Sequence, residues 1–137
     1  TSTEADPRGI EADGNLDGDY SDHLRQSDFT VENMTIVNNA ANTTDNVDRM
    51  QDVIKIRRGA KATITNAFVK GSGGTIDLID MNDSKGAGNA ASSISITHTL
   101  NFKNKLNGTL NTFTEPTTNT GADASLFTWS GYNFSSL

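Results

Sequence analysis

Short runs of alternating apolar and polar residues recur along the chain, and loops rich in Gly, Asn, Asp and Ser separate them. This period of two is typical of β-strands that bury one face. We predict strands at 8–13, 29–37, 53–57, 62–69, 75–79 and 94–102. The stretch 103–120 is rich in Asn and Thr and has weak periodicity, whereas 121–137 regains apolar residues. The pattern therefore predicts an all-β fold.

The predicted strands form two sets that alternate along the chain. One set is Ile10–Asp13, Ile54–Arg57 and Ile76–Ile79, and the other begins at Val31, Ile64 and Ile96. Because every second strand resembles the others of its set, like strands should stack in parallel, as they do in a solenoid. We predict a parallel β-helix of about three turns. It forms a single domain over 1–137, with stacked turns over 7–102 and a C-terminal tail and cap over 103–137.

The first set of strands places charged residues in one outward column. If Ile10, Ile54 and Ile76 face the core, the outward neighbours are Glu11, Lys55 and Asp77. They would lie about 4.8 Å apart in successive turns, with alternating sign. We interpret this column as an exposed charge ladder. A ligand-facing stripe that includes Arg57 is the alternative.

Two further groups of residues have predicted structural roles. Asn33, Asn66 and His98 occupy one column of the second set, where side-chain amides can stack at a corner between two sheets. We expect a structural corner there rather than a ligand site. The C-terminal apolar residues are expected to cap one end of the solenoid: Leu126, Phe127, Trp129, Tyr132 and Phe134.

Composition narrows the classes of function. The chain has 11 Lys and Arg against 17 Asp and Glu, a net charge of −6, which argues against a nucleic-acid partner and an anionic membrane surface. There are no cysteines, so disulfides and thiol catalysis are excluded. No apolar run is long enough to span a membrane.

One acidic segment has the composition of a calcium site. It matches the pattern D-x-N-x-D-G, in which oxygens at alternate positions converge on a hard cation. The candidate ligands are Asp13, Asn15, Asp17, Asp19 and Asp22. Leu24 stands where the full motif has a bidentate Glu. A solvated acidic loop without a metal is the alternative.

Three segments carry a family resemblance: 8–13, 57–71 and 121–128. Together they resemble the C-terminal portion of a family of secreted or outer-surface, right-handed parallel β-helix proteins of Gram-negative bacteria. The resemblance implies a right-handed β-helix on the cell exterior and brings no catalytic residues with it. Members of that family have further turns before the segment at Arg8, so we expect a fragment or processed piece of a larger protein.

The functional hypothesis is a non-enzymatic, extracellular, structural or adhesive segment. A β-helix of a few turns leaves strand edges and apolar residues exposed at its ends. Those ends should meet other copies or other β-helix chains, giving a surface assembly or filament, with calcium as the candidate stabilising ion. The alternatives are a polysaccharide lyase, with Lys55, Arg57 or Arg58 as the base, and a carbohydrate-binding module that uses Trp129 and Tyr132.

Overall fold

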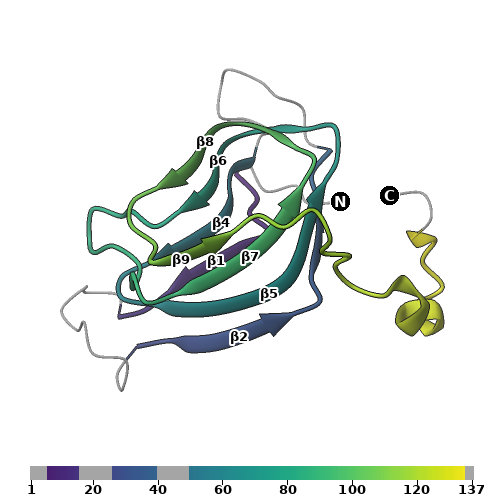
Figure 1. Cartoon of the computed structure of the whole chain (residues 1–137), viewed down its shortest axis with the longest axis horizontal. Helices are drawn as coiled ribbons and strands as arrows, with labels where there is room; N and C mark the ends of the chain where they lie inside the picture. Colours follow the sequence, from purple (N-terminus) through teal and green to yellow (C-terminus); the bar gives the residue numbers. More distant parts are fainter. Residues whose placement is uncertain (1–5, 16–25, 40–49, 135–137) are drawn as a thin grey trace.

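The computed structural model describes residues 6–15, 26–39 and 50–134, and its strands form two parallel sheets (Figure 1). Sheet A has the order β1-β4-β6-β8: Ile10–Asp13, Met50–Arg57, Gly74–Asp80 and Asn101–Asn107. Sheet B has the order β2-β5-β7-β9: Asp28–Glu32, Lys61–Lys70, Ser93–His98 and Thr112–Thr114. Strand β3 (Thr35–Val37) also pairs with β5. A 3-10 helix, η2 (Ala124–Ser130), follows the strands.

The chain alternates between the two sheets, so each strand pairs with strands one coil away. This confirms the predicted parallel β-helix, whereas its right-handed winding stays a prediction. The described strands form four coils rather than about three. We call β1, β2 and β3 the first coil, β4 to β7 the two central coils, and β8 and β9 the last coil. The stack thus continues beyond residue 102 as far as Thr114. The alternation in β8 is weak because only Phe102 and Leu106 are apolar there.

Two columns of inward side chains show how the core is built. In sheet A, Ile10, Ile54, Ile79 and Leu106 are aligned from coil to coil. In sheet B, the aligned residues are Val31, Ile64, Ile94 and Phe113. The members in the central coils have exposed fractions of 0 to 1%. Their neighbours in the first and last coils are only partly buried.

The predicted register holds for the first step of each set. Ile10 pairs with Ile54, and Val31 pairs with Ile64, as the sequence repeats predict. The next step in sheet B differs from the prediction, because Ile64 pairs with Ile94 rather than Ile96. A bulge between Ile64 and Ala67 then brings Ala67 opposite Ile96. The extra residue in β5 explains why the alignment of similar sequence segments did not predict the register of β5 on β7.

After β9, residues 115–123 run back along the side of sheet B from the last coil to the first. We call this segment the strap. Thr97 of β7 donates a hydrogen bond to the Pro116 carbonyl. The Thr120 amide donates to Asn66 Oδ1 at 2.8 Å, and the Ala122 amide donates to Thr35 Oγ1 at 2.9 Å. The strap therefore contacts strands from three coils before η2 extends to the right of the body in Figure 1.

Candidate functional site

A four-residue pattern recurs once in each coil of sheet A and builds a charged cluster. In β4 it is Asp52-Val53-Ile54-Lys55, and in β6 it is Asp77-Leu78-Ile79-Asp80. Both middle residues are fully buried in each strand. Simple alternation is therefore broken, and the two polar residues of each pattern lie together. Lys55 Nζ lies 4.0 Å from Asp52 Oδ2 and hydrogen-bonds the Asp80 carboxylate.

The same pattern continues into the outer coils. The first coil has Arg8 and Glu11 in the outer positions, and the last coil has Asn104 and Asn107. Arg8 Nε donates to Asp52 Oδ2 at 3.0 Å. Asn104 Nδ2 and Asn107 Nδ2 donate to the two oxygens of Asp77 at 2.7 and 3.3 Å. The buried carboxylates of this cluster thus have side-chain partners from the first, second and last coils.

The predicted charge ladder is correct for its first pair and wrong for its second. Glu11 pairs with Lys55 in register, but Lys55 pairs with Asp80 rather than Asp77. The β4 and β6 strands are offset by three residues from the prediction because the buried pairs Val53-Ile54 and Leu78-Ile79 align. Lys55 and Asp77 are also buried, with exposed fractions of 9 and 5%, so the ladder is not a solvent-exposed one.

Among the described residues, Asp52, Asp77 and Asp80 form an acid cluster, a group of three carboxylates close enough together to hold one metal ion. One carboxylate oxygen from each lies within 4.8 Å of the others. Oxygen donors of this kind suit a hard divalent cation such as calcium. However, the ammonium group of Lys55 already bonds Asp80, and Arg8 already bonds Asp52. A cation would therefore compete with the side chain of Lys55 for this position.

Burial is the largest influence on the ionisation of Asp52. Removal from water raises the pKa of Asp52, against the hydrogen bond from Arg8 and the charge of Lys55. Asp13, in the first coil, behaves in the opposite way, because the hydrogen bonds from Arg57 lower the pKa of its carboxyl group. Arg57 Nε lies 2.6 Å from Asp13 Oδ1, and its NH2 group also bonds Glu11 at 2.6 Å.

That contact bears on the predicted calcium loop. Of its five candidate ligands, the structure describes Asp13 and Asn15, and the Asp13 carboxylate is held by Arg57. The Asn15 amide donates to the side chain of Gln26. The other three candidates, Asp17, Asp19 and Asp22, lie outside the described residues. Calcium binding at this loop therefore stays a prediction, with Arg57 as a competitor for Asp13.

The predicted corner is present for two of its three residues. Asn33 and Asn66 have positive φ angles of 57° and 49°, a conformation that Asn tolerates better than most residues. Asn66 Nδ2 donates to Asn33 Oδ1 at 2.8 Å. Asn66 Oδ1 also accepts hydrogen bonds from the strap. The side chain of Asn66 therefore joins the corner to the strap.

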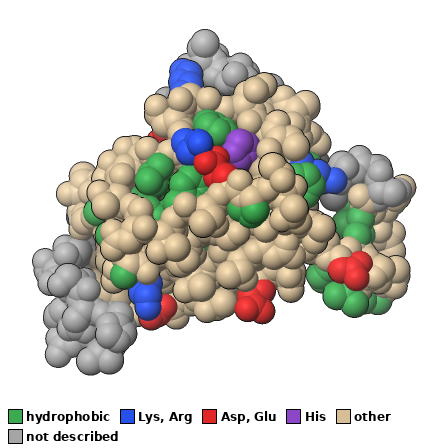
Figure 2. Space-filling view, in the orientation of Figure 1, with side chains coloured by type: hydrophobic (Ala, Val, Ile, Leu, Met, Phe, Trp, Pro, Cys, Tyr) green, Lys and Arg blue, Asp and Glu red, His purple; other side chains and the backbone are tan. Residues whose placement is uncertain are grey.

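His98 does not belong to this corner, because the bulge in β5 places it opposite Val69. It contacts the beginning of the strap instead. His98 Nε2 lies 2.9 Å from Glu115 Oε1, and Lys105 Nζ lies 2.6 Å from Glu115 Oε2. Burial acts against the ionised carboxylate, but the bonds from Lys105 and His98 outweigh it and lower the pKa of Glu115. Figure 2 shows a histidine, a basic and an acidic side chain gathered on this face.

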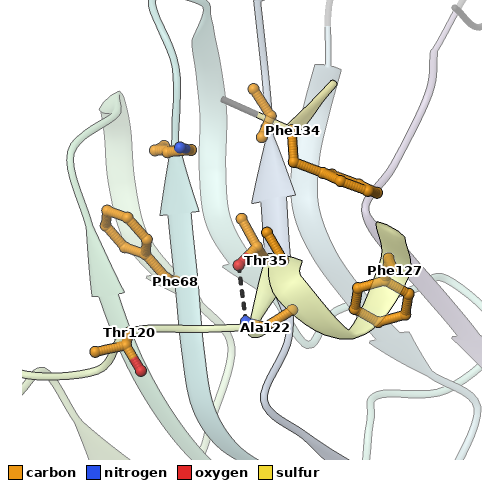
Figure 3. A pocket seen from close by; sticks show the side chains of 9 residues that line it. Thr35, Phe68, Thr120, Ala122, Phe127 and Phe134 are labelled. Atoms are coloured by element: carbon orange, nitrogen blue, oxygen red, sulfur yellow. Dashed lines mark hydrogen bonds between the residues drawn. The ribbon is translucent and has the colours of Figure 1, made fainter. Parts of the chain in front are cut away.

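The aromatic residues of the tail do not cap the solenoid. Leu126, Trp129 and Tyr132 are exposed by 69, 83 and 56%. Helix η2 has no buried residue. Together with β3 and β5 the tail encloses a cleft of about 360 Å³ on the side of sheet B (Figure 3), lined by Thr35, Val37, Phe68, Lys70, Thr120, Ala122, Ala124, Phe127 and Phe134. The strap directs the tail to the side of the stack, which is why it misses the ends.

The two ends of the stack are consequently open among the described residues. Ile10, Phe29 and Val31 of the first coil are only partly buried. In the last coil the same holds for Phe102, Leu106, Leu110 and Phe113. Figure 2 shows apolar side chains at the surface over the region between β8 and β9. These ends combine apolar side chains with edge strands that pair on one side only.

Sequence reasoning missed Arg8, Asp52, Asp80, Asn104 and Asn107. The signal that identifies them is a four-residue pattern. Its first and fourth residues are polar, and its third residue is Ile or Leu. It reads R-G-I-E, D-V-I-K, D-L-I-D and N-K-L-N in successive coils. Comparison of Ile-x-Ile triplets alone hides this pattern.

The fold defines a class, a parallel β-helix with a buried ionic cluster in one sheet. A family model described as a pectate-lyase-like β-helix domain matches residues 1–132. The chain therefore belongs to this family. No curated protein and no solved structure matches it. Within the described ranges, the structure has no helix of the length and apolar character needed to cross a bilayer.

Proposed function

We propose that this chain is a non-enzymatic structural segment, acting outside the cell or on a bacterial surface, that associates end to end with β-helix coils of other chains. The observation that supports this is the pair of open ends. The core columns are sealed in the central coils and partly exposed at Ile10 and Val31 on one end and at Leu106 and Phe113 on the other.

The physical reason is that both kinds of exposed group gain from a neighbour. Apolar side chains gain roughly 25 cal/mol for each Å² removed from water. Edge strands gain hydrogen-bond partners when another strand continues the sheet. A terminal coil of another β-helix supplies both, because its spacing and inward columns match.

Light scattering with one end variant tests this proposal. Leu106→Asp places a charge in the last-coil core column, and we expect it to abolish association of the purified chain. Leu126→Asp makes the same change on the exposed tail, outside both core columns, and should leave association intact. A native chain that stays monomeric at all accessible concentrations would refute the proposal. Equal loss in both variants would place the contact elsewhere.

A second candidate function is action on acidic polysaccharides, which the name of the family and the acid cluster favour. In this candidate, calcium held by Asp52, Asp77 and Asp80 would bind a uronate, and a nearby basic residue would accept the proton in an elimination. Against it stands the pairing of Lys55 with Asp80 and of Arg57 with Asp13.

An ultraviolet assay for unsaturated products with calcium separates the two candidates. The first candidate expects no product from polyuronates, with or without the metal. Product formation that chelation stops and that Lys55→Met lowers while Lys61→Met does not would favour the second. Lys61 is a matched control because its partner, Asp28, lies outside the acid cluster.

A further inference from the structure

The first and last coils carry the same types of residue in the core columns as the central coils do, so a further coil could stack on either end. Each step of sheet A carries the inward position from Ile10 to Ile54, Ile79 and Leu106. Each step of sheet B carries an outward position through Thr30, Thr63, Ser93 and Thr112. The residue types at the two ends of a column are therefore interchangeable. Leu106 can stack on an isoleucine like Ile10, and Thr112 on a threonine like Thr30.

The strands of the two ends carry opposite charge. In the first coil, β1 and β2 contain the four carboxylates Glu11, Asp13, Asp28 and Glu32, and no basic residue. In the last coil, β8 and β9 contain Lys103 and Lys105 and no acidic residue. Arg8, Arg57 and Lys61 offset part of the acidic charge of the first coil, and Glu115 offsets part of the basic charge of the last coil, so the strand charges of the two ends differ by less than a full count suggests.

The charged cluster also favours one order of stacking. The columns that run through Asp52 and Lys55 end in the neutral amides Asn104 and Asn107 of the last coil. A following first coil would set Arg8 and Glu11 beneath those amides. Contact between two first coils would instead bring together two pairs of strands that carry carboxylates and no basic residue, and like charges in adjacent strands repel.

We infer that the partner at each end is a second copy of this chain, joined head to tail, with Leu106 stacked on Ile10 and Thr112 on Thr30 of the next copy. This rests on the proposed function and specifies its partner and register. The contact joins two different surfaces and continues the stacking direction of the coils, so each copy leaves an end free for the next and the contact repeats as a filament. Its opposite charges make it weaker at high salt.

Cross-linking tests the register directly, because the native chain contains no cysteine. One preparation carries Thr30→Cys and another carries Thr112→Cys, and both positions are exposed. Mixed under oxidising conditions, the two should form a disulfide-linked heterodimer, and neither should form a homodimer alone. In the control, Thr114→Cys replaces Thr112→Cys. It lies on the same face two residues further on, about 8 Å from the target Cα, beyond disulfide reach. We expect it to give at least about tenfold less cross-linked dimer.

The outcomes separate this inference from the proposed function. If the native chain remains monomeric by light scattering, both fail. If it associates while Thr30→Cys or Thr112→Cys alone forms homodimers, the contact is symmetric and the inference fails while the proposed function stands. If Thr114→Cys cross-links as well as Thr112→Cys, the register is wrong. Salt screens the attraction between exposed charges. Association that becomes stronger rather than weaker in about 0.5 M salt would therefore contradict the charge argument.

Discussion

The central and terminal coils use the same columns of residues in different surroundings. Ile54 and Leu106 hold equivalent positions in sheet A, yet Ile54 is fully buried and Leu106 lies at an open end. Asp52 and Asp13 are both sheet A carboxylates with an arginine partner, yet their pKa values shift in opposite directions. The difference shows that a neighbour on both sides, rather than residue type, decides how far each position is buried and in which direction its pKa shifts.

The largest effect should come from the apolar column. We expect Ile54→Ala to lower the free energy of unfolding by about 4 kcal/mol, because it leaves a cavity between two well-packed coils. Leu106→Ala should cost about 1 to 2 kcal/mol, because part of that side chain is already in water. Urea unfolding at a concentration where the chain is monomeric measures both. Equal losses of unfolding free energy in the two variants would show that Leu106 is as well buried as Ile54.

The buried ion pair should come next. Lys55→Met leaves the Asp80 carboxylate without its ammonium partner, at side-chain exposures of 11 and 7% for the two residues, and we expect a loss of about 3 kcal/mol. Lys61→Met removes a pair with Asp28 that is exposed by 31 and 38%, and should cost less than about 1 kcal/mol. Adding Asp80→Leu to Lys55→Met should recover much of the loss. No recovery would mean that Lys55 acts through packing rather than charge.

The smallest effect is a difference in pH dependence. The pKa of Asp13 is lowered below its ordinary value of 3.8, so its stabilising contribution is complete above 3.8 and is lost as the pH falls through the folded-state pKa. The pKa of Asp52 is raised, so its contribution has the opposite sign: it is most favourable below 3.8 and decreases as the pH rises through the folded-state pKa.

Unfolding of the native chain, Asp13→Asn and Asp52→Asn between pH 3 and 7 compares the two directly. The deficit of Asp13→Asn relative to the native chain should grow as the pH rises, whereas that of Asp52→Asn should shrink. Charges facing Asp13 come from Arg57, Arg58 and Asp83, and those facing Asp52 come from Arg8, Lys55 and Asp80. Parallel slopes would contradict the assignment of burial as the dominant effect at Asp52.

The candidate site shows where sequence reasoning reaches its limit. Glu11 opposite Lys55 and Asn33 beside Asn66 follow from repeats that are regular over one step. The pairing of Lys55 with Asp80 does not, because Ile76-Asp77-Leu78 has the same alternation as Ile54-Lys55-Ile56 and matches it equally well. Likewise, the apolar residues near Trp129 have the composition of a cap, and composition does not reveal the path of the strap that carries them to the side.

The sequence by itself determined the parallel β-helix and the register of Ile10 on Ile54 and of Val31 on Ile64, because both depend on a local period of two and on repeats along the chain. Only the tertiary structure decided the register of β4 on β6, the burial of the charged cluster, the position of His98 and the open ends. Those features depend on contacts between residues far apart in sequence: two aligned buried pairs, a bulge in β5, and a strap that crosses three coils.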